Sequence, residues 1–139
     1  MVTTITKSLE IDAGHRLLKH ESKCRNVHGH RYRFDIEVTA AHLDEVGRVI
    51  DFGCIKEIIG GWLDENWDHA FLAEAGDPII KFLTMNSQKL DVLLVPPTAE
   101  NLARLILEAC IFHLPQEIKT VSVTCWETPS CKATVRRTQ

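Results

Sequence analysis

Residues 28–40 read HGHRYRFDIEVTA, and they contain the clearest periodicity in the chain. From Tyr32 to Ala40, apolar side chains occupy the even-numbered positions and polar or charged side chains occupy the odd-numbered ones. A strand points successive side chains to opposite faces of its sheet, so this segment is predicted to be a half-buried strand. If the strand extends back to the start of the quoted segment, His28 and His30 also point toward the buried side.

A first strand is predicted from Thr4 to Ala13, where apolar residues recur at odd-numbered positions with an interruption at Lys7. His15 continues this phase just beyond the strand. Together with the two histidines of the second strand, it would direct three imidazoles inward from two neighbouring strands. Burying three imidazoles is costly unless hydrogen bonds or a ligand satisfy them.

Two explanations for the three histidines are open. Each can be a core residue that is hydrogen-bonded to the backbone, which is the ordinary situation of a single buried histidine. Alternatively, a metal accounts for all three at once, because zinc accepts neutral imidazole nitrogens and catalytic zinc sites use three protein ligands with an open fourth position. We therefore expect a zinc ion held by His15, His28 and His30.

Cys24 stands four residues before His28, between Lys23 and Arg25. It could be a fourth zinc ligand and close a structural site of one thiolate and three imidazoles. The neighbouring positive charges instead favour a reactive thiolate, which can act as a base. The sequence leaves both roles open.

Asp68 and His69 are adjacent in the chain. Because neighbouring side chains on a regular element do not face each other, the simplest expectation is a solvated loop pair. Glu100 lies in the first turn of a predicted helix, where a carboxylate stabilises the helix N-terminus. From position alone, none of these three residues requires a catalytic role.

Glu127 continues the strand period of the three apolar residues before it, and it falls on their face unless the strand ends first. A buried carboxylate needs a partner. Glu127 could bend to water at the strand end. It could also anchor a ligand that offers two parallel N–H donors, such as an aminopyrimidine edge. Both interpretations are open.

Two helices are predicted after the first pair of strands in the sequence. Asp51 can cap a helix whose apolar residues recur from Ile55 to Leu63. Thr98 can cap a second helix, which Pro115 ends. Residues 67–97, between the two helices, show no clear period, so no element is assigned there.

Two final strands are predicted on either side of a turn at Thr128–Ser130, and their alternating apolar residues are Val121, Val123, Cys125, Cys131, Ala133 and Val135. The order of elements is then strand, strand, helix, helix, strand, strand. We therefore expect one α+β domain over residues 1–139, with an antiparallel four-stranded sheet and two helices on one face.

Composition and charge exclude several classes of function. The 139 residues, 45% of them hydrophobic, can bury the core of one ordinary domain. The formal net charge is -3 and no Lys/Arg tract could neutralise a run of phosphates, so we expect no nucleic-acid partner. Five irregularly spaced cysteines do not predict a disulfide framework. Without an apolar leader or a membrane-length apolar window, the chain is expected to be a cytoplasmic protein without a membrane partner.

Five segments occur in an order that is familiar from a known family. They are IDAGHRL (11–17), CRNVHGHRY (24–32), DHAFL (68–72), PTAENLA (97–103) and WET (126–128). The chain thereby resembles the 6-pyruvoyl- and 6-carboxy-tetrahydropterin synthase family over most of its length. The cysteine followed, after three residues, by His-Gly-His is the most specific segment.

The resemblance implies a tunnelling fold, in which trimers form sheet to sheet and two trimers stack into a homohexamer with active sites between subunits. It implies a pterin substrate, 7,8-dihydroneopterin triphosphate, and Zn²⁺ as the cofactor. The residues that match the family's functional positions are the zinc ligands His15, His28 and His30, the catalytic residues Cys24, Asp68 and His69, and the pterin-pocket residues Glu127, Thr98 and Glu100. By charge and nearness to the cysteine, Lys19, Lys23 and Arg25 are candidates for meeting the triphosphate.

The three residues between Cys24 and His28 are similar to the short gap of the carboxy-forming branch, whereas the pyruvoyl-forming branch usually has a longer one. The implied products are 6-carboxy-tetrahydropterin, acetaldehyde and triphosphate, in 7-deazaguanine synthesis such as that of queuosine. 6-Pyruvoyl-tetrahydropterin synthase is the alternative activity, and a noncatalytic zinc- and pterin-binding module is the alternative class. Two features depart from the family pattern: Gly14 replaces the usual Ala, and the stretch before Val92 is longer than in compact members.

Overall fold

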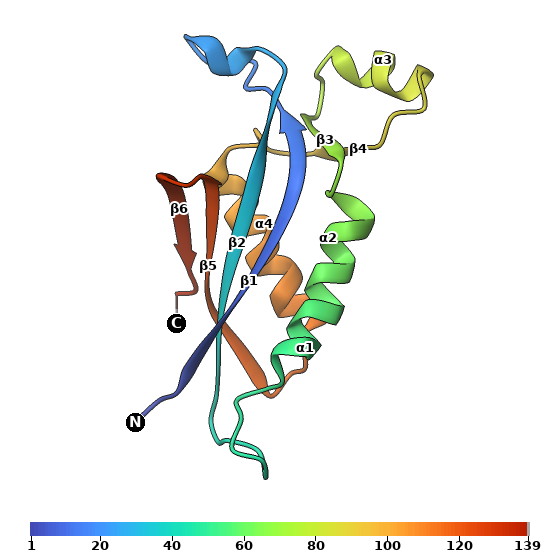
Figure 1. Cartoon of the computed structure of the whole chain (residues 1–139). Coiled ribbons are helices and arrows are strands. Elements are labelled where there is room, and N and C mark those ends of the chain that lie inside the picture. Colours follow the sequence, from blue (N-terminus) through green and yellow to red (C-terminus); the bar gives the residue numbers. More distant parts are fainter. Residues whose placement is uncertain (139) are drawn as a thin grey trace.

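A computed structural model describes residues 1–138 of the chain. Its strands are β1 (Thr4–His15), β2 (His28–Ala40), β3 (Ala70–Glu74), β4 (Leu90–Leu93), β5 (Ile118–Thr128) and β6 (Cys131–Arg136). Its helices are the short 3₁₀ helix η1 (Lys23–Arg25), α1 (Phe52–Ile55), the π-helical turn η2 (Lys56–Gly60), α2 (Gly61–Asn66), α3 (Ile79–Met85) and α4 (Ala99–His113). In Figure 1, β1, β2, β5 and β6 form a curled sheet, and α4 and the α1–α2 segment cover one face.

The sheet of residues 1–138 has six strands in the order β4-β3-β1-β2-β5-β6. The pairs β1–β2, β2–β5 and β5–β6 are antiparallel, as expected, whereas β3 runs parallel to β1 and β4 runs parallel to β3. The expected four-stranded antiparallel sheet is therefore wrong, and the sheet is mixed. The strand β3 is buried without alternation, so its apolar run carries no period-2 signal that distinguishes it from a buried helix.

The pairing of β1 with β2 sets the positions of the histidines. The strand β1 extends to His15 and β2 begins at His28, and these two residues are direct register partners. His30 is paired with Ala13, which is the inward-facing residue of β1 next before His15. The expected inward phase of all three histidines is thus confirmed, because both strands continue past the regular alternation of their apolar residues.

The helices begin where their caps predict. The Asp51 side chain accepts a hydrogen bond from the Gly53 backbone N–H, and the Thr98 hydroxyl accepts one from the Asn101 N–H. Glycines at 60 and 61 do not end the first helical segment, since a π-helical turn carries it on to α2. No helix within residues 1–138 is both long enough and apolar enough to cross a membrane.

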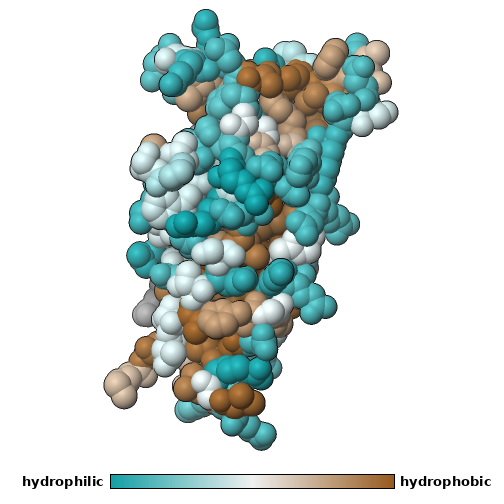
Figure 2. All heavy atoms as spheres, viewed as in Figure 1, coloured by the Kyte–Doolittle hydropathy of each residue, from teal (hydrophilic) through white to brown (hydrophobic). Residues whose placement is uncertain are grey.

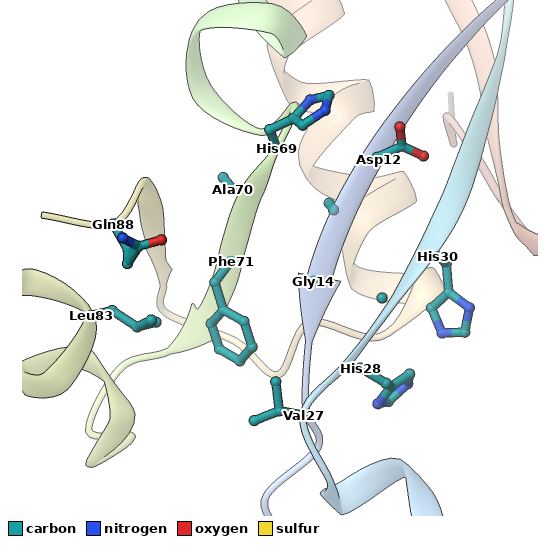
Figure 3. Close-up of a pocket in the computed structure, with 12 residues that line it drawn as sticks. Asp12, Gly14, Val27, His28, His30, His69, Ala70, Phe71, Leu83 and Gln88 are labelled. Atoms are coloured by element: carbon teal, nitrogen blue, oxygen red, sulfur yellow. The ribbon is translucent and has the colours of Figure 1, made fainter. Parts of the chain in front are cut away.

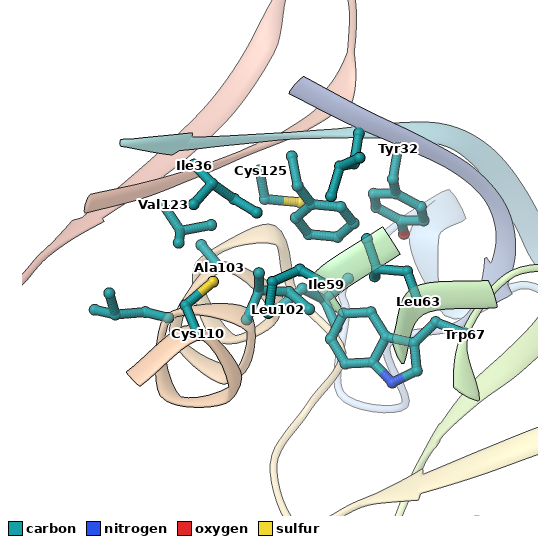
Figure 4. Close-up of a cluster of buried hydrophobic side chains, with 14 of the residues drawn as sticks. Tyr32, Ile36, Ile59, Leu63, Trp67, Leu102, Ala103, Cys110, Val123 and Cys125 are labelled. Carbon is teal, nitrogen blue, oxygen red and sulfur yellow. The ribbon is translucent and has the colours of Figure 1, made fainter. Parts of the chain in front are cut away.

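The core lies between the sheet and these helices (Figure 4). Inward residues of β2, such as Tyr32 and Ile36, face α2 and α4. Trp67, which follows α2, packs in the same buried cluster. Cys110 of α4 and Cys125 of β5 are buried within this core. Burial raises the pKa of the Cys110 thiol to about 12, so this group behaves as an inert apolar residue.

Two segments project from the end of the sheet at which β1 finishes (Figure 1). One is the connection between β1 and β2, which contains η1, and the other is α3 between β3 and β4. The Trp67 indole N–H donates to the Asp91 carboxylate of β4 at 2.7 Å, so the second segment is attached to the end of α2. The candidate site lies between the two projecting segments.

Candidate metal centre and active site

The three histidines converge at the end of the β1–β2 ladder. His15 is the last residue of β1 and is 1% exposed, and its Nε2 lies 3.1 Å from the Nε2 of His28. The ligand nitrogens of His15, His28 and His30 all lie within 4.8 Å of one another. Figure 3 shows His28 and His30 projecting from β2 toward the same side. The parity of two neighbouring strands is therefore sufficient to assemble the group.

The hydrogen bonds of two rings fix where their lone pairs point. His15 Nδ1 donates to the Pro97 carbonyl at 2.7 Å, and His28 Nδ1 donates to the Asn26 carbonyl at 2.7 Å. Because a carbonyl oxygen can only accept, each neutral ring carries its proton on Nδ1 and its lone pair on Nε2. In the neutral rings the two lone pairs then approach each other across 3.1 Å, an arrangement that a cation bound to both nitrogens would stabilise.

His30 completes this set of acceptors. Its Nε2 is buried and has no hydrogen-bond partner among the described residues. Burial lowers the pKa of both His15 and His30, although the nearby Glu127 carboxylate acts in the opposite direction. Neutral imidazoles whose free nitrogens converge, with the outer nitrogens of two rings oriented by carbonyls, are the donor set that a zinc ion takes. These residues could hold such a metal.

Glu127 lies beside the histidines. Its Oε1 is 3.5 Å from His15 Nε2 and 3.6 Å from His30 Nε2. The register between β5 and β6 shifts between Trp126 and Thr128, so Glu127 sits at an irregularity of the strand and not at a regular inward position. The side chain is directed at the histidines, and its role as a pterin anchor stays a prediction.

Cys24 belongs to η1 and is half-buried. Within residues 1–138, two groups of possible ligand atoms lie within 4.8 Å of one another, the three histidines and the set Asp12, Asp68 and His69, and neither contains a cysteine sulfur. The geometry therefore offers no support for Cys24 as a fourth ligand. The thiol remains available as a base, as the resemblance implies.

Asp68 and His69 face each other despite being adjacent. The Asp68 Oδ2 lies 3.1 Å from His69 Nδ1, and Asp68 Oδ1 accepts the Asp12 backbone N–H at 3.0 Å. The two residues lie in the turn before β3, as expected of a loop pair, and the rule for neighbours on a regular element does not apply there, since His69 has a positive φ of 59°. His69 is 75% exposed, so its imidazole is accessible to a ligand.

The charge state of Asp68 follows from its surroundings. Burial alone would raise the pKa of this carboxyl, but the Asp12 N–H, the hydrogen bond to His69 and the charge of Lys89 together hold it below its ordinary value. Asp68 is therefore an ionised group that can orient the His69 ring and stabilise its protonated form. This is the arrangement of an acid–base pair.

A cavity of about 490 Å³ lies beside this end of the β1–β2 ladder (Figure 3). Its lining includes His28 and His30 from β2, His69 before β3, and the apolar side chains of Val27, Phe71 and Leu83. Figure 2 shows apolar atoms gathered between the two projecting segments at this end of the molecule. The lining also includes Gly14 and Gly29, whose face of the β1–β2 ladder is opposite to that of the three histidine side chains, so within one chain the acid–base pair and the converging histidine nitrogens lie on different faces.

The other predicted pocket residues lie elsewhere around the histidines. Thr98 caps α4 and lines a separate cavity of about 240 Å³ together with Lys19. Glu100 lies in the first turn of α4 and is exposed. Neither residue, nor Cys24 or Glu127, lines the cavity that contains His69. Their proposed functions stay predictions.

Sequence reasoning missed two residues that hold the acid–base pair. Asp12 acts through its backbone, and its carbonyl also accepts the His69 N–H at 2.6 Å. The Lys89 ammonium donates to the Asp68 carbonyl at 2.6 Å. A backbone contact has no side-chain signature, and Lys89 lies in the stretch without periodicity, so neither could be found from the sequence.

Comparison with known proteins identifies the family. The sequence model described as 6-pyruvoyl tetrahydropterin synthase matches residues 4–138. The chain belongs to this family of enzymes. A 6-carboxy-5,6,7,8-tetrahydropterin synthase of Rickettsia bellii is 42% identical, with 91% of this chain and 94% of the relative covered. A probable 6-carboxy-5,6,7,8-tetrahydropterin synthase of Halobacterium salinarum is 36% identical, with 91% and 82% covered.

Solved structures show the same fold. An uncharacterized protein of Wolinella succinogenes superposes with a TM-score of 0.85 at 22% identity, with 99% of both chains covered. The 6-pyruvoyl tetrahydropterin synthase of Caenorhabditis elegans superposes with a TM-score of 0.73 at 23% identity, with 99% of this chain and 97% of that one covered. The mixed, curled sheet with few helices is therefore the architecture of the family.

Proposed function

We propose that the chain is a zinc-dependent 6-carboxy-tetrahydropterin synthase. It would convert 7,8-dihydroneopterin triphosphate to 6-carboxy-5,6,7,8-tetrahydropterin and release acetaldehyde and triphosphate, in the synthesis of 7-deazaguanines such as queuosine. The observation that carries this proposal is the convergence of three histidine nitrogens, in a chain of the pterin synthase family that also has the Asp68–His69 pair. The names of its relatives at 42% and 36% identity support the same activity.

The metal site supplies one part of the chemistry. His15, His28 and His30 would hold the ion through their ring nitrogens, and the Pro97 and Asn26 carbonyls keep two of these rings in the required tautomer. When bound, zinc supplies Lewis-acid chemistry that lowers the pKa of the hydroxyls on the pterin side chain. The remaining chemistry belongs to protein side chains.

Proton transfer is assigned to two groups. His69, oriented and charge-balanced by Asp68, takes or returns a proton at its Nε2. The Cys24 thiolate takes the other proton, since the geometry leaves it out of the metal group. Glu127 holds the aminopyrimidine edge of the pterin through two parallel hydrogen bonds, and Thr98 and Glu100 line the rest of the ring pocket.

The complete site is proposed to form between subunits of a homohexamer built from two trimers. On the side away from β2, β1 pairs with β3 only at Ala13–His15, so its backbone before Ala13 has no strand partner there within residues 1–138. The strand β6 is the other edge of the sheet. Two open edges suit sheet-to-sheet association. Assembly of this kind would bring residues that do not line a common cavity within one chain, such as His69 and Glu127, into one site.

Two alternatives are distinguished by experiment. Purified protein loaded with zinc should be incubated with 7,8-dihydroneopterin triphosphate, and the products identified by mass spectrometry. The proposal requires 6-carboxy-tetrahydropterin, whereas 6-pyruvoyl-tetrahydropterin would assign the other branch. A noncatalytic zinc- and pterin-binding module would bind without turnover, and its cobalt-substituted form would show a thiolate charge-transfer band if Cys24 closed the shell.

A further inference from the structure

The segment from Asp77 to Lys89 connects β3 to β4, and it is attached to the site at both ends. It leaves the sheet after β3, forms α3 and returns into β4. At its first end, the Asp77 carboxylate is 3% exposed and accepts two hydrogen bonds from Arg16, one of them from Nε at 2.9 Å. Arg16 directly follows the proposed zinc ligand His15.

The second end meets the acid–base pair. The Lys89 ammonium donates to the carbonyl of Asp64 at 2.7 Å and to the carbonyl of Asp68 at 2.6 Å. The Lys89 carbonyl itself accepts the Phe71 N–H at 3.1 Å, which joins the segment to β3 just after His69. The ammonium therefore bridges the end of α2 and the start of β3.

The peptide between Asp68 and His69 is held on both of its polar atoms. Its carbonyl accepts from Lys89, and its N–H donates to the Asp12 carbonyl of β1 at 2.6 Å. A peptide fixed at both ends sets the orientation about the following φ. His69 has a φ of 59°, a left-handed conformation that is uncommon for residues with a side chain and that the two hydrogen bonds of this peptide support.

We propose that Lys89 is a positioning residue, whose ammonium fixes the Asp68–His69 peptide and so keeps the His69 imidazole against the Asp68 carboxylate and open to the cavity. This inference rests on the proposed function, in which His69 transfers a proton. The Asp77–Arg16 pair anchors the other end of the same segment, which restricts the movement of the segment that carries Lys89.

Charged groups of β1 and of the segment before β4 flank the pair. The Asp12 carboxylate of β1, itself paired with Arg31 at 3.0 Å, and the Lys89 ammonium before β4 are the charged groups that flank Asp68 and His69. Replacing lysine by methionine keeps an unbranched apolar stem of nearly the same length, but it removes the N–H donors and the charge. Replacing it by arginine keeps both the charge and the donors.

The test compares turnover by Lys89→Met, Lys89→Arg and the control Lys81→Met, which alters an exposed lysine of α3 within the same segment. We expect Lys89→Met to lower kcat about tenfold while KM and zinc content stay near those of the unchanged protein, since small misplacements of a catalytic group impair the chemical step. Lys89→Arg should recover most of the loss. Amide hydrogen exchange at His69 should be faster in Lys89→Met and unchanged in Lys81→Met.

A double variant separates this inference from the proposed function. If Lys89 acts through His69, Lys89→Met should cause no further loss of turnover in a His69→Ala background. An unchanged kcat in Lys89→Met, or an equal fold loss in both backgrounds, would overturn the positioning role while leaving the proposed function intact. Full activity of His69→Ala would instead overturn the assigned role of His69, and the inference with it.

Discussion

His15 Nε2 and His28 Nε2 lie 3.1 Å apart with their lone pairs directed at each other, because each ring uses its Nδ1–H for a backbone carbonyl. A cation bound to both nitrogens would relieve this repulsion, and the His30 imidazole is placed to serve as a third ligand. We predict that the zinc-loaded protein contains about one zinc per chain and that His28→Ala loses most of it. Metal analysis after dialysis measures this, with His42→Ala as a control in an exposed loop. Full zinc occupancy in His28→Ala would refute the assignment.

Cys24→Ala should keep its zinc and its fold but lose turnover. The thiol lies outside the group of converging ligand atoms, and a base in proton transfer contributes about 10²-fold or more to the rate. Zinc content, the circular dichroism spectrum and kcat are measured on the same preparation. Loss of zinc from Cys24→Ala would favour a closed structural site and count against catalysis at this centre.

Glu127→Gln should weaken pterin binding by about tenfold or more, since the amide keeps the shape but gives up a charge-assisted pair of hydrogen bonds. Metal content should stay the same, because Glu127 approaches only two of the three histidines and is outside the ligand group. Calorimetry with a dihydropterin measures the affinity, and Glu108→Gln on the exposed face of α4 is the matched control. Unaltered affinity would remove Glu127 from the pocket.

The Asp77–Arg16 pair makes stability depend on pH. Hydrogen bonding to Arg16 holds the pKa of the Asp77 carboxyl below its ordinary value, although burial opposes this. A lowered folded-state pKa contributes stability that is fully present above the unfolded pKa of about 3.9 and is lost as the pH falls through the folded value.

Asp77→Asn should therefore lower the free energy of unfolding by about 2 kcal/mol at pH 7, and the difference from the unchanged protein should shrink below about pH 4. Urea unfolding of the metal-free proteins at a series of pH values measures the difference, without interference from zinc release. A difference that is the same at pH 7 and pH 3 would show that the ion pair is not its source.

Much of the fold could be predicted because the relevant signals are local. The alternation in β2 predicts the face of the sheet to which His28 and His30 point, and the alternation in β1 predicts it for His15. The pairing of these two strands then brings the three imidazoles together. The caps Asp51 and Thr98 were predicted from residue type and position, and both are confirmed. Their physical basis is a hydrogen bond within three residues of the chain.

The remainder depends on contacts between distant residues. The parallel strands β3 and β4 have no periodicity of their own, and they are strands because β1 offers an open edge. Asp68 faces His69 only because a positive φ is imposed by partners at positions 12 and 89. No pattern within a short window of sequence contains that information.

The most direct test of the account is a titration of metal-free protein with zinc while acetaldehyde release from 7,8-dihydroneopterin triphosphate is followed. This single measurement joins the histidine site to the proposed reaction. We predict that the rate of acetaldehyde release rises in proportion to added zinc and levels off near about one equivalent per chain. Acetaldehyde release that is independent of zinc, or its absence at every zinc concentration, would contradict the account.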